Sequence, residues 1–394
     1  MVDGAERLLS ARFLTMCAFS FTVFLSAFQL IPTAPFRIVD LGGTRFTAGL
    51  FLGLLTYASA FTAPITGALA DRLGRRRTLI GCSLVLSLLA VGYAMSTRPA
   101  TMLVLVAVHG FFWSGLLAAS SAYTSELVPA GRRAEGIGYW GLSTMLAVAV
   151  APSVGLWLYQ FGWMAMCLSV GVLNLLMAGI AVTLPDDRAG RPPAPRHAFF
   201  TRDLVEWRIL VVALTMFLYA FGYGGVTSFA AMYAQASGVH PTGLYFTAFA
   251  AVVILTRPFS GRLADRLGHV RVFVPCLLLI VAAYALLALG GSRGWLLASA
   301  AALGLGLGSA YPIFAAWILD HVATERRGAA FGSLLAAFDT GLGTGSISLG
   351  WIIEHHGYRV AFGLAAAVAS LALPYFLLVG TRTLVSQVNP PAPR

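Results

Sequence analysis

Long apolar runs separated by short polar turns make up most of the chain, and they predict membrane-spanning helices. A helix of ~20 residues, at ~1.5 Å per residue, crosses the ~30 Å apolar core of a bilayer. Such runs must be helical because lipid offers the backbone no hydrogen-bond partners. They lack the two-residue alternation of a membrane barrel. Twelve spans are expected, at residues 13–35, 47–69, 78–96, 101–124, 136–158, 163–184, 209–233, 242–264, 272–290, 295–318, 329–353 and 359–379.

A polar segment between the sixth and seventh spans separates two halves of equal span number. It runs from Pro185 to Arg208 and contains five arginines. We therefore expect four regions: an N-terminal six-helix bundle at 1–184, a linker at 185–208, a C-terminal six-helix bundle at 209–380 and a tail at 381–394.

A charged turn occurs once in each half and relates the two halves to each other. Residues 67–77 read GALADRLGRRR and residues 261–271 read GRLADRLGHVR, so eight of the eleven positions are identical at an offset of 194 residues. The same offset places Glu126 on Asp320. A repeat of this length indicates a duplicated domain rather than a solenoid. The predicted fold class is an all-α polytopic membrane protein with two pseudo-symmetric six-helix bundles.

The distribution of charge gives the chain an orientation. Residues are 58% hydrophobic and only 10% charged, against about 25% charged in a soluble protein. The net charge is +11, but 20 of the 26 arginines fall in alternate loops and only five in the opposite loops. This bias predicts that both termini, the linker and both charged turns are cytoplasmic. The positive charge is therefore read as a topology signal, and no nucleic-acid partner is expected.

The repeated turn resembles the loop between the second and third helices of the major facilitator superfamily of transporters. The resemblance extends over nearly the whole chain. It implies two six-helix halves that rock about a substrate site near the midplane of the membrane. It also implies a monomer in the bacterial inner membrane, driven by a proton gradient and without a cofactor.

The resemblance implies that the charged turns form a cytoplasmic gate. In the family, the aspartate matched by Asp71 holds the halves together in the outward-open state. Asp71 ends its helix, where the helix dipole disfavours a carboxylate, so a partner is expected. The alternative is a solvated turn that only sets topology. The predicted gate consists of Gly67, Asp71, Arg72, Gly74, Arg75 and Glu126, with a weaker second copy at Asp265, Arg266 and Asp320.

Asp339 is a carboxylate near the centre of the eleventh predicted span. A charge at this depth costs ~2.5–3.5 kcal/mol on insertion scales. Arg257 is the other strongly charged residue well inside a span. Two alternatives follow. The residues form a permanent pair that fixes the eighth and eleventh spans, or the pair opens and Asp339 takes a proton or contacts substrate.

His109 lies near the middle of the fourth span and completes the predicted proton-coupling set with Asp339 and Arg257. An imidazole can titrate near neutral pH. The family often has an arginine four residues before the glycine of this span, where this chain has Val106. Because this chain lacks that arginine, His109 becomes a stronger candidate for proton coupling. The alternative is a histidine that forms a hydrogen bond between helices.

Aromatic residues gather in the first, fourth, seventh and tenth spans, which line the cavity in the resembled family. Such a cavity suits amphipathic or cationic organic molecules, although ordinary helix packing explains any single ring equally well. The predicted cavity residues are Phe28, Gln29, Trp113, Tyr219, Tyr223, Tyr311 and Phe314. No metal site is expected, because the sequence 354–356 (Glu-His-His) reads as a solvated loop. No phosphate-binding glycine loop supports ATP-driven transport.

The function predicted from the sequence is proton-coupled export of a small organic compound by antiport. The alternative is proton symport or facilitated uptake of a small metabolite, such as an organic acid. A membrane enzyme would need a catalytic cluster at the membrane surface, and a receptor would need a soluble output domain. The sequence offers neither, so the chain is predicted not to be an enzyme.

Overall fold

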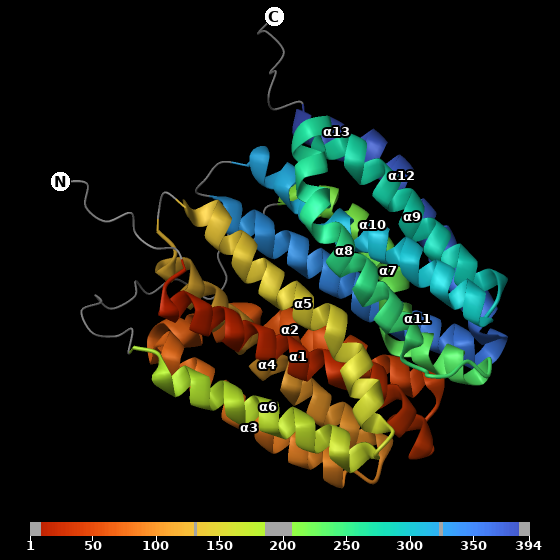
Figure 1. Ribbon diagram of the computed structural model, residues 1–394, viewed down its shortest axis with the longest axis horizontal. Helices are drawn as coiled ribbons and strands as arrows, with labels where there is room; N and C mark the ends of the chain where they lie inside the picture. The colour runs from red at the N-terminus through yellow and green to blue at the C-terminus, as the bar shows by residue number, and fades with distance from the viewer. Residues whose placement is uncertain (1–8, 130–131, 186–206, 323–325, 386–394) are drawn as a thin grey trace, which may run out of the picture. The chain divides into compact units, whose positions relative to one another are not determined.

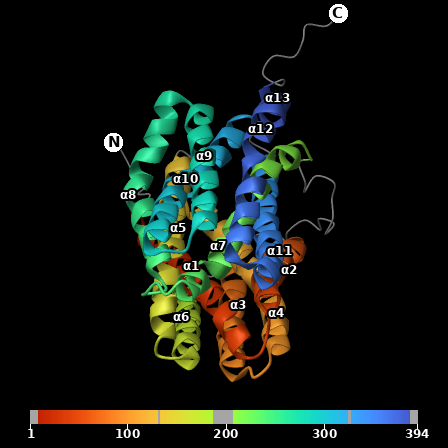
Figure 2. The same ribbon diagram turned by 90° about the vertical axis from the view of Figure 1, so that its right-hand side faces the viewer.

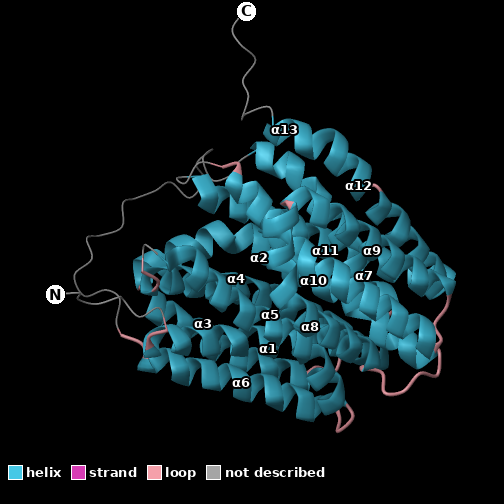
Figure 3. Cartoon of the chain, turned by 45° about the horizontal axis from the view of Figure 1, so that its top comes forward, coloured by secondary structure: helices cyan, strands magenta, loops and turns pink. Residues whose placement is uncertain are grey.

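The computed structural model describes residues 9–129, 132–185, 207–322 and 326–385, which form helices joined by short loops (Figures 1 and 3). No strand occurs in these ranges. The first half contains α1 (Ala11–Asp40), α2 (Arg45–Leu73), α3 (Arg75–Met95), α4 (Pro99–Leu127), α5 (Arg133–Tyr159) and α6 (Trp163–Thr183). The second half contains α7 (Trp207–Ala236), α8 (Leu244–Leu267), α9 (His269–Leu289), α10 (Arg293–Asp320), α11 (Arg327–Ser370), α12 (Ala372–Tyr375), the π-helix Phe376–Gly380 and α13 (Thr381–Val385).

The described part of the chain is the polytopic α-helical protein that the sequence predicts. Ten of its helices are long and apolar enough to cross a membrane, or eleven if the bent pair Leu244–Arg257 and Phe259–Leu267 counts as one span. Helix α11 has 44 residues and contains a non-helical Gly357 at φ +82°. A straight helix of this length would reach ~66 Å, about twice the ~30 Å core. The predicted fold class is confirmed, and the number twelve stays a prediction.

The chain forms two compact units. Unit 1 contains residues 1–37 and 58–199, and unit 2 contains residues 38–57 and 200–394. Residues 38–57 belong to unit 2 because the first turns of α2 pack closely on α11. The predicted linker falls largely at 186–206, outside the described residues, so the predicted division of the chain into bundles stays a prediction.

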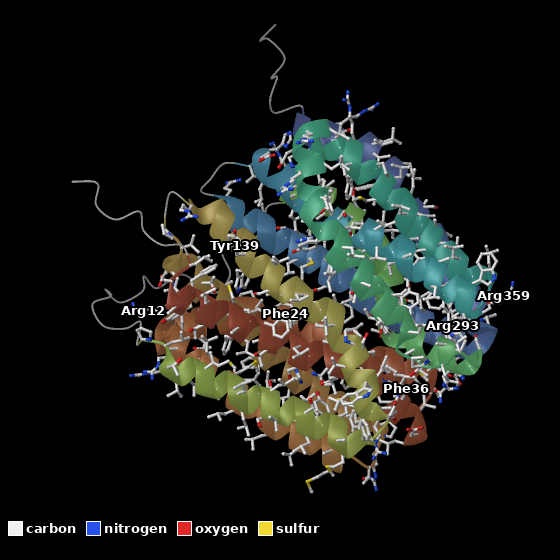
Figure 4. All side chains as sticks on the ribbon, viewed as in Figure 1. Arg12, Phe24, Phe36, Tyr139, Arg293 and Arg359 are labelled. Carbon is white, nitrogen blue, oxygen red and sulfur yellow. The ribbon has the colours of Figure 1, made fainter. Side chains whose placement is uncertain are left out.

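Helices in unit 1 are joined by small residues and buried polar groups. Gly155 of α5 faces the backbone of Gln29 in α1, where a Cβ would lie 2.6 Å from the Gln29 carbonyl oxygen. The Ser26 hydroxyl donates to Asn174 Oδ1 at 3.3 Å, which joins α1 to α6. Figure 4 labels Arg12 and Phe36, which lie at opposite ends of α1.

The packing of α11 along α7 dominates unit 2, and Figures 1 and 2 show the two helices side by side. Glycines face the partner helix from both sides. A Cβ on Gly341 would lie 2.5 Å from the Phe217 carbonyl oxygen, and one on Gly345 would collide with the carbonyl of Phe221. A Cβ on Gly224 would collide with the Leu342 carbonyl. The backbones can approach this closely only because these positions have no side chain.

The two charged turns are sharp reversals, as the sequence predicts. Gly74 precedes α3 with φ +92°, and Gly268 precedes α9 with φ +91°. These left-handed conformations favour glycine because a Cβ would be strained there. Figure 4 also labels Arg293 and Arg359, which lie at the same end of unit 2. The membrane side of each end stays a prediction.

Candidate functional site

Asp339 lies in the middle of the apolar part of α11, roughly 18 Å along the helix from Arg327 at ~1.5 Å per residue. The side chain is half-buried. Within the described residues, no hydrogen bond or ion pair reaches its carboxylate. Asp339 is close enough to Tyr311 of α10 for an electrostatic interaction. An unpaired carboxylate at this depth is costly, so its retention points to a function.

Aromatic rings surround the residue next to Asp339. The ring of Phe338 lies 6.3 Å from Tyr219, 6.3 Å from Tyr223 and 5.5 Å from Tyr311, measured between centroids. Tyr223 also contacts Phe249 of α8 at 6.2 Å. Three of the predicted cavity tyrosines are therefore brought together around Phe338, and one of them, Tyr311, also interacts with Asp339. Tyr219 and Tyr223 are buried, and Tyr311 is half-buried.

Two hydroxyls of α7 near this cluster lack a hydrogen-bond partner in the described part of the chain. They are Thr215 Oγ1 and Tyr219 Oη, one helical turn apart and both fully buried. Buried polar groups are usually paired, so each unpaired group needs an explanation. A water molecule or a polar ligand would satisfy both.

Arg257 of α8 is half-buried and is held by a backbone group. Its Nη1 donates to the carbonyl oxygen of Gly308 in α10 at 2.8 Å. No ion pair joins Arg257 to Asp339 in the part of the chain that the structure describes. The described structure therefore does not contain the permanent Arg257–Asp339 ion pair that was one of the two alternatives suggested by the sequence.

At the first charged turn, Arg75 carries the ion pair. Its guanidinium pairs with Glu126 at the end of α4, and its Nη1 also donates to the Ala122 carbonyl oxygen at 3.0 Å. Asp71 is exposed, and none of the described residues forms a hydrogen bond or ion pair with it. The sequence suggested Arg72 and Glu126 as the network of Asp71. Glu126 pairs with Arg75, which joins the start of α3 to the end of α4.

The second charged turn contains a matching pair. His269 Nδ1 lies 3.6 Å from Asp320 Oδ2, which is an ion pair only when the histidine is protonated. The offset of 194 residues places Arg75 on His269 and Glu126 on Asp320. Both halves thus join the start of one helix to the end of the next at equivalent positions. The sequence reasoning missed His269, although the repeat itself was the signal that could have found it.

Three other predicted gate residues have simpler surroundings. Asp265 and Arg266 are exposed, without a hydrogen bond or ion pair to any described residue. A Cβ on Gly67 would meet nothing within 4 Å. We therefore find no close helix packing at Gly67, in contrast to the role suggested for it by the sequence.

Among the predicted cavity residues of unit 1, the aromatic ones cluster and the amide does not join them. Phe24 contacts Phe28 at 6.0 Å and Trp113 at 5.3 Å between ring centroids (Figure 4 labels Phe24). Gln29 is only 1% exposed, and its Oε1 accepts a hydrogen bond from Ser169 Oγ at 3.1 Å. Gln29 thus links α1 to α6 instead of facing an open space.

Phe314, the last predicted cavity residue, belongs to the packed interior of unit 2. It is 1% exposed and stacks on Phe273 of α9 at 4.9 Å. Phe376 and Trp317 cover its other sides at 5.9 Å and 5.8 Å. Its role is helix packing, which was the alternative left open for each ring.

His109 is placed between α3 and α4. It is 2% exposed, and its Nδ1 lies 3.4 Å from Tyr93 Oη, with ring centroids 6.1 Å apart. The backbone of Tyr93 is itself fixed, because Trp163 Nε1 donates to its carbonyl oxygen at 2.8 Å. This geometry favours the hydrogen-bonded alternative over a role in proton coupling.

The change His109→Gln should therefore leave the pH profile of transport unchanged. Glutamine keeps a polar group that can pair with Tyr93, so we expect a loss of stability of only about 1 kcal/mol. The measurement is the initial transport rate across a pH series, with thermal unfolding of the purified protein. A displaced pH profile with normal stability would return His109 to the proton-coupling set.

A polar cluster ties the start of α2 to α11 at the predicted outer end of unit 2. Glu354 Oε2 accepts a hydrogen bond from the Arg45 backbone N–H at 2.8 Å and lies 3.7 Å from Arg45 Nη1. Arg45 Nε donates to Tyr358 Oη at 3.4 Å. Further along α2, the hydroxyls of Tyr57 and Thr344 are 2.6 Å apart. Glu354 is therefore not the solvated loop residue suggested by the sequence.

Small residues let the two helices meet between these polar contacts. The Ser346 hydroxyl donates to the Gly49 carbonyl oxygen at 3.0 Å and lies 2.8 Å from Ser228 Oγ of α7. A Cβ on Gly53 would collide with the side chain of Ile347. Sequence reasoning missed this contact. The usable signal was a glycine at both Gly49 and Gly53, one turn apart on an apolar helix.

Comparison with known proteins gives these features a common context. The profile of the Major Facilitator Superfamily matches residues 13–240 and 212–393. The MFS-type transporter YhhS of Escherichia coli K12 is 23% identical over 377 residues, which cover 93% of this chain and 91% of YhhS. The multi-drug resistance efflux pump PmrA of Streptococcus pneumoniae is 24% identical over 297 residues, which cover 72% of this chain and 74% of PmrA.

Solved structures of transporters share the fold. A bacterial homologue of the human lysosomal transporter Spinster, inward-facing and unoccupied, has a TM-score of 0.77 at 17% identity, covering 99% of this chain and 100% of its own. The nucleoside transporter NupG has a TM-score of 0.75 at 16% identity, covering 94% of this chain and 99% of its own. At these identities the similarity is one of fold alone.

Proposed function

Because this chain belongs to the Major Facilitator Superfamily, whose members are secondary transporters, we propose that it exports a small organic compound in exchange for protons. Ten or eleven of its helices are candidate membrane spans, and its relatives are transporters. The proposal concerns the direction, the coupling ion and the kind of substrate. Its energy source is the proton gradient, with no bound cofactor, and the working unit is a monomer in the bacterial cell membrane.

The unpaired carboxylate of Asp339 is the observation that carries the proposal. It lies near the middle of a predicted span and close to Tyr311, and none of the described residues supplies it with a counter-charge. A carboxylate in such a position either binds a proton or binds a cation. A site that binds either a proton or a cationic substrate, but never both at once, exchanges the proton for the substrate. This competition is the minimum requirement for antiport.

The surroundings of Asp339 favour a substrate with a positive charge and an apolar body. Tyr219, Tyr223 and Phe338 offer ring faces and edges, on which cations and flat organic groups bind well. The free hydroxyls of Thr215 and Tyr219 could accept or donate one hydrogen bond each. PmrA, which covers most of this chain, is described as a multi-drug efflux pump, and this agrees with export.

Uptake of a small anionic metabolite is the second candidate function. Arg257 favours it, because only one of its five N–H donors has a partner among the described residues, at Gly308. The guanidinium could bind an organic acid, with the proton on Asp339 moving in the same direction. The two candidates differ in the sign of the bound charge and in the direction of proton flow.

Transport in proteoliposomes under an imposed pH gradient tests the proposal. For this test the vesicles have an acidic lumen. An organic cation with an aromatic group should move from the outside solution into the lumen and accumulate there as protons move out. A small organic acid should not move. Accumulation of the acid together with protons would instead establish symport, and movement of neither compound under any gradient would contradict proton coupling.

Two sets of contacts would act as gates during this cycle. The Arg75–Glu126 and His269–Asp320 pairs stiffen the predicted cytoplasmic turns within their own units. The Arg45–Glu354 contact ties α2 to α11 at the predicted outer end. Exposed Asp71 is free to contact another partner in a different conformation, which agrees with its proposed role in a cytoplasmic gate.

The change Asp71→Asn should slow turnover about tenfold while leaving substrate affinity within about twofold. Asparagine keeps the shape but removes the charge that a gate contact would use, and an exposed ion pair contributes up to about 1 kcal/mol. Binding by calorimetry and transport rate in vesicles separate the two effects. Asp265→Asn, at the matching position of the second turn, is the control and should have the smaller effect. A normal turnover rate in Asp71→Asn would remove this residue from the gate.

A further inference from the structure

The carbonyl oxygen that Arg257 contacts is free because of a proline. In an α-helix, the carbonyl of residue 308 would accept a hydrogen bond from the N–H of residue 312. Residue 312 is Pro312, which has no N–H, yet α10 continues through it from Arg293 to Asp320. Arg257 Nη1 donates to this oxygen at 2.8 Å. The guanidinium thus supplies the hydrogen bond that the helix itself lacks.

The helix that carries Arg257 is interrupted at the same place. Two straight segments of α8, Leu244–Arg257 and Phe259–Leu267, meet at an angle of 51°. Arg257 is therefore the last residue before a bend, and it reaches the weakened turn of the neighbouring helix. Arg257 thus joins the bend of α8 to the proline-containing turn of α10.

Asp339 lies beside the same face of α10. Gly308 and Tyr311 are three residues apart, so they occupy neighbouring positions on one face of that helix. Arg257 contacts the first, and Asp339 interacts with the second. One helical turn of α10 is ~5.4 Å long. The Arg257 guanidinium sits on a long, flexible stem, so it can leave Gly308 towards the Tyr311 side of this face by changing rotamers, without a change in the backbone of α8.

We propose that Arg257 is a positioning residue that moves between the Gly308 carbonyl and the Asp339 carboxylate as Asp339 loses and regains its proton. This inference rests on the proposed function, in which Asp339 carries the proton. When Asp339 is protonated and neutral, Arg257 stays on Gly308, as in the described arrangement. When the proton leaves to solvent, the carboxylate attracts the guanidinium, and the Gly308 carbonyl loses its donor.

The exchange links protonation to the shape of two helices. With Arg257 on Gly308, α8 and α10 are joined at their weakened turns. With Arg257 on Asp339, that link is open, and α10 can change its bend at Pro312. The proton on Asp339 thereby selects which pair of helices is joined, α8 with α10 or α8 with α11. The exchange needs no further reactant. One proton leaves or returns to Asp339, and the Arg257 guanidinium changes its hydrogen-bond partner.

The titratable side chain that interacts with Asp339 is Tyr311 of α10, and Tyr219 and Tyr223 of α7 contact the neighbouring Phe338. None of these groups can carry a positive charge. Among the described residues of these helices at this depth, Arg257 is the cation available to a charged Asp339. Its two positions therefore decide how readily the carboxylate holds its proton.

An infrared titration of the purified full-length protein tests the exchange without a substrate. The carboxylic-acid C=O band of Asp339 is assigned by its loss in Asp339→Asn, and its intensity is followed against pH. Arg257→Gln removes the counter-charge and should raise the midpoint by about one pH unit, since a nearby opposite charge lowers such a midpoint by 1–3 units. Pro312→Ala restores the N–H to Gly308, releases Arg257 towards Asp339, and should lower the midpoint.

Opposite shifts are the decisive result, because general damage to the helices would move both midpoints the same way. Pro275→Ala, a helix-interior proline of α9 in the same unit, is the control and should leave the midpoint at the parent value. If Arg257→Gln does not fold, Arg257→Lys replaces it. The midpoint should then rise less, because lysine keeps the positive charge but lacks the planar guanidinium that binds a carboxylate with two hydrogen bonds.

Equal midpoints in the parent, the arginine variant and Pro312→Ala would overturn the exchange, as would shifts of both variants in one direction. These outcomes leave the proposed function standing if Asp339→Asn still lacks proton-driven transport. Conversely, coupled transport in Asp339→Asn would overturn the proposed function whatever the infrared midpoints show. The two failures are therefore distinguishable.

Discussion

Asp339→Asn should abolish proton-driven accumulation of substrate, reducing it at least about a hundredfold, to the level of empty vesicles. Asparagine has nearly the same shape but cannot exchange a proton. No described residue pairs with the carboxylate, so the substitution leaves no partner unsatisfied. It also removes a charge that costs ~2.5–3.5 kcal/mol at the membrane centre, so stability should be equal or higher. Loss of transport would then be loss of coupling rather than loss of the fold.

The measurement is accumulation in proteoliposomes under an imposed pH gradient, together with downhill exchange of labelled substrate at equal pH. Exchange should survive in part, because it needs binding without net proton movement. Thr340→Val is the matched control. Its hydroxyl bonds the Ala336 carbonyl of its own helix at 2.6 Å, so its loss should leave accumulation close to the parent value. If Asp339→Asn accumulates substrate with the parent pH dependence, Asp339 is structural at most.

Gly345→Ala is expected to be the most destabilising single methyl addition in the α7–α11 contact. The new Cβ would collide with the Phe221 carbonyl and lie 2.8 Å from the Phe221 Cα. These are backbone atoms, which cannot move aside as a flexible side chain can. Overpacking costs about 1–3 kcal/mol, and a backbone clash belongs at the upper end of that range. We expect a loss of about 3 kcal/mol in the stability of unit 2.

Thermal unfolding followed by a thiol-reactive dye is a suitable measurement, because Cys276 of unit 2 is 5% exposed and becomes reactive on unfolding. Gly332→Ala is the matched control on the same helix, since a Cβ there meets nothing within 4 Å. Alanine favours a helix over glycine by about 1 kcal/mol, so the control should be neutral or slightly more stable. Equal midpoints for the two variants would show that α7 and α11 are not packed at Gly345 as described.

These two predictions concern neighbouring parts of one helix. Gly341 and Gly345 fix α11 against α7, and Asp339 lies just before them in the chain. Gly49 and Gly53 of α2 meet the same stretch of α11 from another side. Asp339 is thus followed in the chain by close backbone contacts, and its own carboxylate takes no part in a described hydrogen bond or ion pair. Such a group can change its charge without breaking a contact that holds the helices together.

Much of the site was visible in the sequence as unusual residues in apolar runs. A single aspartate at mid-span is conspicuous because lipid offers a charge no solvation, and Asp339 therefore stands out without any structure. The tyrosines of α7 and α10 were predicted as a group and are brought together around Phe338. Gln29 and Phe314 were assigned to the cavity but are packed between helices, because helical spacing alone does not say which face of a buried helix points inward.

The sequence could not predict which groups form hydrogen bonds and ion pairs with each other. Arg257 and Asp339 look like a natural pair when only charges and depths are compared. The competing acceptor, the Gly308 carbonyl, is a backbone group that becomes available through Pro312 and has no signal of its own in the pattern of side chains. Likewise, the sequence did not indicate that Glu126 pairs with Arg75. Each choice depends on which side chains reach each other across helices.

The sequence by itself determined the helices, the repeat of 194 residues and the buried ionisable groups, because apolar length and lone charges in apolar runs are local properties. Only the tertiary structure decided which groups are satisfied and which are free. Helices meet at crossings set by glycines such as Gly224 and Gly345, and those crossings fix the neighbours of every polar atom. The unpaired Asp339 and the Arg257 held by the Gly308 carbonyl are both results of that packing, and the proposed transport cycle depends on them.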